Sequence, residues 1–146
     1  MRDFIGELRV LLSYPKNILL LAARIVVAYG FALPAMVKIN DLSSTAKWFE
    51  KLHIPFSYIS AYLVSTIETI GLVLLVFGLF TRFVSLLLSC VMIGAIYFVH
   101  WRHGFNAADN GFEIPLYYLL FLLILATYGA GKYSLDHLLF KDSIYE

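Results

Sequence analysis

The chain has 146 residues, of which 61% are hydrophobic and 14% are charged, and its mean hydropathy is +0.81. An ordinary soluble domain is about one quarter charged, so these few charges could not cover a soluble monomer, and disorder is excluded for the same reason. The formal net charge of +1 gives no electrostatic basis for binding nucleic acid. We expect Cys90 to be a small buried residue, because a single cysteine forms no internal disulfide.

The N-terminal segment, residues 2–13, has the periodicity of an amphipathic helix. Its apolar residues share one face and its charged residues lie elsewhere. It lacks the long apolar core of a cleavable signal peptide, and Pro15 ends the pattern. We therefore predict that residues 1–16 form a short helix at the membrane interface.

Four apolar stretches follow, at residues 17–37, 57–80, 83–101 and 112–130. Each is close to the length that crosses a hydrocarbon core of about 30 Å. Because backbone polar groups inside lipid must be paired internally, these spans are predicted to be helices. A buried soluble bundle is the alternative, and the scarcity of charged faces disfavours it. The sequence predicts an all-α membrane protein with a four-helix transmembrane domain over residues 17–131.

The connections between the spans are unequal in length. Thr81-Arg82 alone joins the second and third spans, which predicts a tight antiparallel hairpin. Residues 102–111 are rich in Gly, Asn and Asp and predict a polar turn. The long segment 38–56 predicts a loop with one short helix, N-capped by the Ser43-Ser44-Thr45 cluster. Residues 132–146 are expected to form a short cytoplasmic tail.

The distribution of Lys and Arg predicts the orientation. With four spans both termini lie on one side, and that side carries more basic residues than the other. The predicted inner side holds Arg2, Arg9, Lys16, Arg82, Lys132 and Lys141, and the outer side holds Lys38, Lys47, Lys51 and Arg102. This small excess favours cytoplasmic termini.

Two charged residues, Arg24 and Glu68, lie well inside the predicted spans, away from the span ends. Such a group is costly in lipid unless it is paired or hydrated. Arg24 lies roughly 10 Å and Glu68 roughly 18 Å from the inner side, so the two side chains could pair. In one interpretation the pair fixes helix register. In the other it lines a polar pocket, extended by Ser65 and Thr69, that binds the head group of a lipid-soluble ligand such as a quinone.

A second polar cluster, His100, His103, Asp109 and Glu113, lies near the outer ends of the third and fourth spans. Imidazoles and carboxylates can bind a transition metal. The spacing matches no strong zinc or iron motif, and histidine is ordinary at a membrane edge. We therefore predict no metal site and keep these four residues as its only candidates.

Three sequence features point to one family. The second span carries Glu68 and spaced glycines before its closing Thr81-Arg82, and residues 129–136 read Gly-x-Gly-x-x-Ser-x-Asp. Arg24 is followed fourteen residues later by Lys38. In these features residues 18–138 resemble the DoxX family of small four-span bacterial membrane proteins. The chain departs from that family at Pro34, where many members have a glycine, which implies a different bend in the first span.

The resemblance implies a four-span fold and a link to redox chemistry. The family includes a membrane subunit of thiosulfate:quinone oxidoreductase, and other members are linked to redox-stress partners. By this resemblance Arg24, Glu68 and Glu113 are candidate pocket residues. It implies no catalytic residue.

We therefore expect a bacterial inner-membrane protein that acts as a quinone-associated or redox-linked subunit. Whether it is an enzyme stays open; if so, it is a subunit of a quinone-linked oxidoreductase. The alternative is a non-catalytic anchor for soluble redox enzymes. A small transporter ranks last, because four spans leave little room for alternating access. No cofactor motif is evident, and quinone is the candidate ligand. The expected partners are membrane lipids, a redox protein and a second copy of the chain in a homodimer.

Overall fold

The computed structural model describes residue 7 and residues 15–140. The predicted interfacial helix over residues 2–13 therefore lies outside the described residues, apart from Glu7, as do the last six residues of the expected tail. Within the described part the chain is helical and contains no strand. The main helices are α2 (Lys16–Asn40), α3 (Leu42–Lys51), α4 (Ser57–Phe77), α5 (Thr81–Ala95), α6 (Glu113–Tyr128) and α7 (Leu135–Leu139).

Three helical segments are long and apolar enough to cross a membrane: Lys16–Asn40, Ser57–Phe77 and Thr81–His103. The third continues from α5 through a π-helix, η1 (Ile96–His100), and a 3₁₀ turn, η2 (Trp101–His103). The fourth apolar helix, α6, has only 16 residues, about 24 Å of helix. The all-α membrane fold is confirmed, with a fourth helix shorter than the others.

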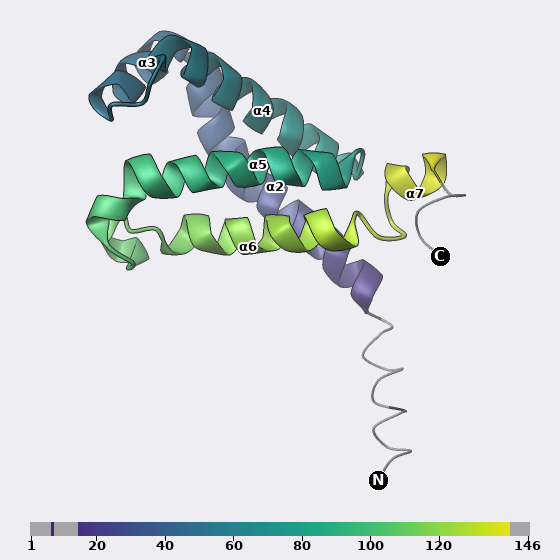
Figure 1. Cartoon of the computed structure of the whole chain (residues 1–146). Helices are drawn as coiled ribbons and strands as arrows, with labels where there is room; N and C mark the ends of the chain where they lie inside the picture. Colours follow the sequence, from purple (N-terminus) through teal and green to yellow (C-terminus); the bar gives the residue numbers. More distant parts are fainter. Residues whose placement is uncertain (1–6, 8–14, 141–146) are drawn as a thin grey trace.

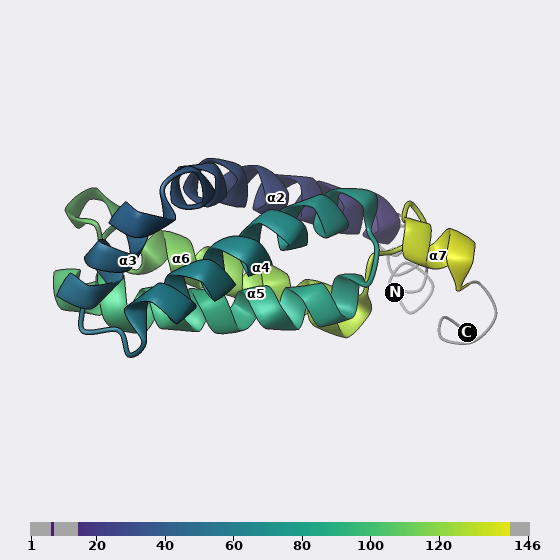
Figure 2. The same cartoon turned by 90° about the horizontal axis from the view of Figure 1, so that it is seen from above.

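The helices pack as two pairs, α2 against α4 and α5 against α6 (Figures 1 and 2). The core lies between the pairs and takes a large apolar side chain from every long helix, including Val27, Leu75, Leu88 and Leu122. All four are almost fully buried. Apolar residues from each long helix thus fill one shared core.

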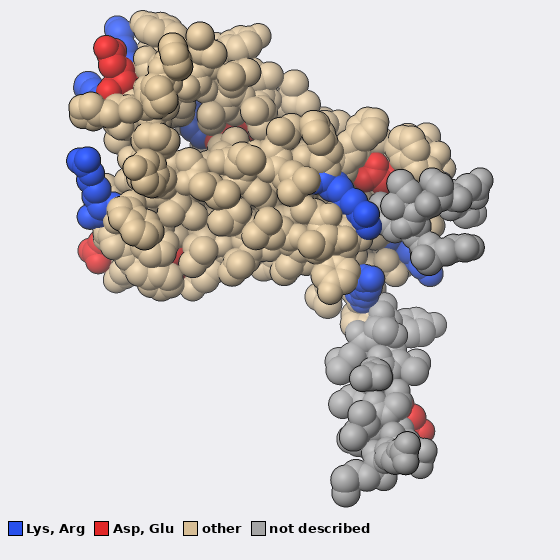
Figure 3. Space-filling model, viewed as in Figure 1, with Lys and Arg blue, Asp and Glu red and all other residues tan. Residues whose placement is uncertain are grey.

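The two ends of the bundle differ. At one end, here called the terminal end, lie the start of α2, the α4–α5 turn and α7 (Figure 1). At the other, here called the loop end, lie α3 and the loop with η3 (Ala107–Asp109). Charged side chains gather at these ends, and the surface between them is largely uncharged (Figure 3). This is the charge distribution of a protein with an apolar belt in lipid.

The α4–α5 turn differs from the predicted one. The turn is formed by residues 78–80, and Thr81 already begins α5, so the expectation of a Thr81-Arg82 loop was wrong. Gly78 ends α4 with φ +66°, a left-handed conformation that favours glycine. The backbone amides of Phe80 and Thr81 donate to the Asp136 carboxylate at 2.7 and 2.9 Å. The α7 segment, expected to belong to a simple tail, therefore caps the turn.

The short helix α3 begins earlier than predicted. Asp41, and not the Ser43-Ser44-Thr45 cluster, is its N-cap, and the Asp41 side chain accepts from the Ser44 amide at 2.9 Å. Hydrogen bonding by the Ser44 side chain is the largest cause of the lowered pKa of Asp41, and this backbone hydrogen bond is the second. The three hydroxyl residues instead occupy the first turn, where Thr45 Oγ1 donates to the Asp41 carbonyl at 2.9 Å. Helix α3 packs on α4 through Ala46, Phe49 and Ala61.

Candidate functional site

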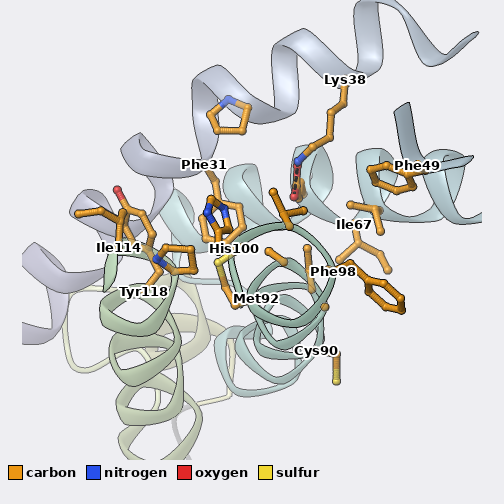
Figure 4. A pocket seen from close by; sticks show the side chains of 18 of the residues that line it. Phe31, Lys38, Phe49, Ile67, Cys90, Met92, Phe98, His100, Ile114 and Tyr118 are labelled. Atoms are coloured by element: carbon orange, nitrogen blue, oxygen red, sulfur yellow. Dashed lines mark hydrogen bonds and ion pairs between the residues drawn. The ribbon is translucent and has the colours of Figure 1, made fainter. Parts of the chain in front are cut away.

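A cavity of about 630 Å³ lies toward the loop end of the bundle. Its walls come from α2, α3, α4, α5 with η1, the loop after η2, and α6. Most of the lining side chains are apolar or aromatic, including Phe31, Phe49, Ile67, Met92, Phe98 and Ile114 (Figure 4). The polar side chains in the wall include Lys38, Glu68, His100 and Tyr118. A mostly apolar pocket with a few polar groups is the usual form of a small-molecule site.

The cavity lies in a wedge between α4 and α5. Near their turn the two helices are close, because a Cβ atom on Gly71 would lie 3.1 Å from the Leu88 side chain. The helices diverge toward the loop end (Figure 1). The exposed residues Leu87 and Cys90 stand at the edge of the cavity on this side. Because Cys90 is exposed, the expectation that it is buried was wrong. Because both residues are exposed and also line the cavity, the cavity extends to the membrane-facing surface.

Lys38 and Glu68 form the ionic part of the wall. Lys38 Nζ lies 2.7 and 2.6 Å from the two Glu68 carboxylate oxygens. The Lys38 side chain extends from α2 toward the Glu68 carboxylate (Figure 4). Glu68 lies on α4 and is only 1% exposed. Two donated hydrogen bonds satisfy the buried carboxylate and leave one ammonium proton for another acceptor. Lys38 therefore has one hydrogen-bond donor that Glu68 does not use, in a side chain that lines the cavity.

The predicted Arg24–Glu68 pair was wrong. The predicted first span ended at residue 37, which placed Lys38 in a loop, but α2 continues through Pro34 to Asn40. Lys38 then lies within reach of Glu68, and Arg24 lies about 21 Å away along the same helix. The sequence did contain a signal for the role of Lys38, because Lys38, fourteen residues after Arg24, is part of the resemblance to the DoxX family.

Arg24 lies outside the cavity lining, at the terminal end, where it is 1% exposed. Its Nη2 donates to the Tyr133 carbonyl, and Asp136 is its nearby opposite charge. A Cβ atom on Gly78 would lie 1.5 Å from Arg24 Nη1, so only glycine leaves room for the guanidinium. Arg24, Gly78, Tyr133 and Asp136, here called the terminal clasp, tie α7 to α2 and to the α4–α5 turn.

Ser65 and Thr69 also lie outside the cavity lining, although they flank Glu68 on α4. Ser65 is fully buried, and its hydroxyl has no hydrogen-bond partner among the described residues. The Thr69 hydroxyl donates to the Ser65 carbonyl at 2.7 Å, a bond within the helix. The predicted extension of a polar pocket by these two residues was wrong.

The polar cluster of His100, His103, Asp109 and Glu113 makes most of its hydrogen bonds within its own loop and the adjoining helix ends. Glu113 accepts from the Ala107 amide and from the Tyr117 hydroxyl, both at 2.9 Å. His103 Nδ1 contacts the Val99 carbonyl at 3.1 Å, and Asp109 lies in η3. Within residues 15–140 no group of three His, Cys, Asp or Glu side chains is placed to hold a metal ion. Of these four residues, only His100 lines the cavity. The prediction that Glu113 is a pocket residue was therefore wrong.

Tyr118 on α6 and Gly30 on α2 were missed in the sequence. A Cβ atom on Gly30 would lie 1.9 Å from the Tyr118 hydroxyl oxygen, so the glycine makes room for this side chain. The Tyr118 ring also packs on Phe31, with centroids 5.8 Å apart. No local pattern links two residues so far apart in the sequence, and only the fold brings them together.

These observations define the class of protein. Long apolar helices packed around one core, with charges at both ends, are those of a multi-pass membrane protein. The DoxX family model matches residues 19–101, and the chain belongs to the DoxX family. The match confirms the resemblance and covers both residues of the Lys38–Glu68 pair.

Three curated relatives support the family assignment. An uncharacterized protein of Haemophilus influenzae is 38% identical over 130 residues, covering 86% of each chain. A second uncharacterized protein of that organism is 35% identical, covering 81% of this chain and 88% of the relative. The Bacillus subtilis protein named "Putative oxidoreductase CatD" is 32% identical over 121 residues, covering 83% of this chain and 87% of the relative. No solved structure matches the chain.

Proposed function

We propose that the chain is a membrane subunit of a redox system and binds a lipid-soluble quinone in the cavity between α4 and α5. The observation that carries this proposal is the Lys38–Glu68 ion pair in the wall of an otherwise apolar cavity of about 630 Å³. A buried ion pair inside a membrane is costly, and it is often kept for function.

The chemistry of a quinone fits these walls. Its ring and methyl groups are apolar, and they would pack on the aromatic and aliphatic lining. One quinone carbonyl oxygen would accept a hydrogen bond from the Lys38 ammonium N–H that Glu68 does not use. The isoprenoid tail would leave past Leu87 and Cys90 into lipid. A ligand dissolved in the membrane could then enter from the side.

The redox role requires a partner protein. The sequence has no nucleotide-binding motif and no cysteine pair, so the electrons would come from a second protein. The printed name of the Bacillus subtilis relative supports a redox link. We place the chain in a bacterial inner membrane with the terminal end on the cytoplasmic side, and homodimer formation belongs to the same proposal.

The test is a binding titration that uses Trp48, which lines the cavity. Trp101→Phe leaves Trp48 as the only tryptophan, and a decyl-substituted benzoquinone in detergent should quench its fluorescence in a saturable way. Glu68→Gln should weaken binding about tenfold or more. Without the Glu68 carboxylate, the Lys38 ammonium group is no longer held at one position in the cavity wall, and its hydrogen bond to the quinone is weakened.

Two further variants complete the test. Gly94→Leu would place a side chain in the cavity and should abolish quenching, because Gly94 lines the cavity and a Cβ atom there meets nothing within 4 Å. The control is Glu50→Gln, which removes an exposed carboxylate from α3. Absent or non-saturable quenching in the parent protein contradicts the proposal. Co-purification of a soluble redox enzyme in that case would favour the anchor role.

A further inference from the structure

His100 lines the cavity, and a backbone carbonyl contacts one of its two ring nitrogens. Its Nδ1 lies 2.7 Å from the backbone carbonyl oxygen of Asn110. A carbonyl oxygen only accepts, so Nδ1 carries the ring proton in neutral His100. Nε2, on the opposite side of the ring, then carries the lone pair. The His100 ring stands among the other side chains of the cavity wall (Figure 4).

The surrounding loop holds this tautomer in place. Asn110 has a left-handed backbone with φ +60°, and its backbone N–H donates to the Ala107 carbonyl oxygen at 3.1 Å. The Ala107 amide in turn donates to the Glu113 carboxylate at 2.9 Å. These contacts direct the Asn110 carbonyl toward His100. Reversing the tautomer would set the lone pair of Nδ1 against that oxygen and would lose the hydrogen bond.

We infer that the cavity binds a hydroquinone more tightly than the corresponding quinone, and that His100 sets this preference. The inference rests on the proposed function. One polar group in the wall, Lys38, is a donor, and another, His100 Nε2, is an acceptor. A hydroquinone satisfies both, because one hydroxyl oxygen accepts from Lys38 and the other hydroxyl donates to Nε2.

A quinone satisfies only the first group. Its two oxygens are acceptors, so the oxygen nearest His100 would face the lone pair of Nε2. The Tyr118 hydroxyl does not discriminate, because a hydroxyl both donates and accepts. The loss of one hydrogen bond corresponds to about a tenfold difference in affinity. Stronger binding of the reduced form would make the bound quinone a better electron acceptor.

The experiment compares both redox forms of one ligand. A decyl-substituted benzoquinone and its hydroquinone are titrated without oxygen into the full chain, with His100→Leu as the test and His103→Leu as the control. His103 also bonds a backbone carbonyl but lies outside the cavity lining. We expect about tenfold tighter binding of the hydroquinone. His100→Leu should remove that difference and leave quinone binding within about twofold, and His103→Leu should retain it.

The outcomes separate the two proposals. Equal binding of both forms by the parent protein, or a preference that survives in His100→Leu, overturns the inference and leaves the proposed function standing. Binding of neither form overturns both. A second measurement needs no variant: the ¹⁵N NMR signal of His100 Nε2 should shift on adding hydroquinone and stay unchanged with quinone. Identical shifts with both ligands contradict the role of His100.

Discussion

Lys38 is the residue that pairs with the buried Glu68 carboxylate. Its ammonium group neutralises Glu68 at 2.6 Å and has a further proton for a ligand. A buried pair of this kind adds little net stability over apolar residues, but a single unpaired charge is strongly destabilising. The ion pair therefore has an energetic signature that a double-mutant cycle can detect.

Lys38→Met and Glu68→Met should each lower the free energy of unfolding by about 3 kcal/mol, because each leaves one charge without its partner. The double variant should regain most of this loss, since two Met side chains of similar length fill the space. Unfolding in mixed micelles, followed by circular dichroism, measures all four proteins. Strictly additive losses would show that the two groups do not interact.

Gly78 makes a second residue-scale test possible. Gly78→Ala would combine an unfavourable φ of +66° with displacement of the Arg24 guanidinium, and should cost about 2 kcal/mol or more. The matched control is Gly94→Ala in α5, where a Cβ atom has open space. That change should be neutral or stabilise by up to about 1 kcal/mol. Equal melting temperatures for the two variants would contradict the terminal clasp.

At the scale of elements, the caps and turns decide what the long helices can hold. Asp136 caps the turn between α4 and α5, and Asp41 caps α3, which covers part of the cavity. Arg24 and Lys38 lie on the same helix, so the distance between them depends on α2 continuing without a break from Lys16 to Asn40. Local segments of a few residues thus fix the positions of charges on helices several turns long.

The Asp41 cap predicts a pH effect confined to α3. Because its pKa is lowered in the folded protein, Asp41 contributes to stability above its unfolded pKa, near 4, and this contribution is lost as the pH falls through the lowered value. In a Trp101→Phe background, Trp48 fluorescence on α3 should change over that acidic range. Asp41→Asn keeps the cap and should show no such change. A transition that persists in Asp41→Asn would assign it to another group.

Much of the helical framework was predictable, because four apolar runs leave few other structures in lipid. The helix bounds were less accurate where single residues decide them. Asp41 moved the start of α3, and Gly78 placed the α4–α5 turn earlier. Partners could not be assigned, because hydropathy says nothing about which charges face one another. Glu68, a pocket candidate from the sequence, lies in the cavity wall. Lys38 belonged to the family pattern without being assigned as its partner, whereas Tyr118 and the contact of the His100 ring became visible only in three dimensions.

At the scale of the whole molecule, the arrangement is asymmetric across the membrane. The terminal clasp closes one end, and the cavity lies toward the other, where α3 and the η3 loop contribute to its walls. Under the proposed function, a soluble redox partner would dock on the membrane face nearer to this cavity. The orientation of the chain is therefore a prediction about function as well as topology.

Labelling of single cysteines in intact cells tests that orientation. In a Cys90→Ser background, Ser43→Cys and Asn106→Cys at the loop end should react with a membrane-impermeant maleimide. Lys132→Cys at the terminal end should react only after the membrane is opened, because the termini are predicted to be cytoplasmic. Labelling of Lys132→Cys in unopened cells, with the loop-end cysteines protected, would reverse the orientation.

The central claim is that the cavity between α4 and α5 holds a quinone, and its most direct test is the ligand content of the protein taken from native membranes. We would purify the parent chain and Gly94→Leu in mild detergent and quantify quinones in the organic extract by mass spectrometry. The account predicts about one quinone per chain in the parent protein and almost none in Gly94→Leu, at equal yield and similar melting temperature. A parent protein without quinone, or equal quinone in both proteins, would contradict it.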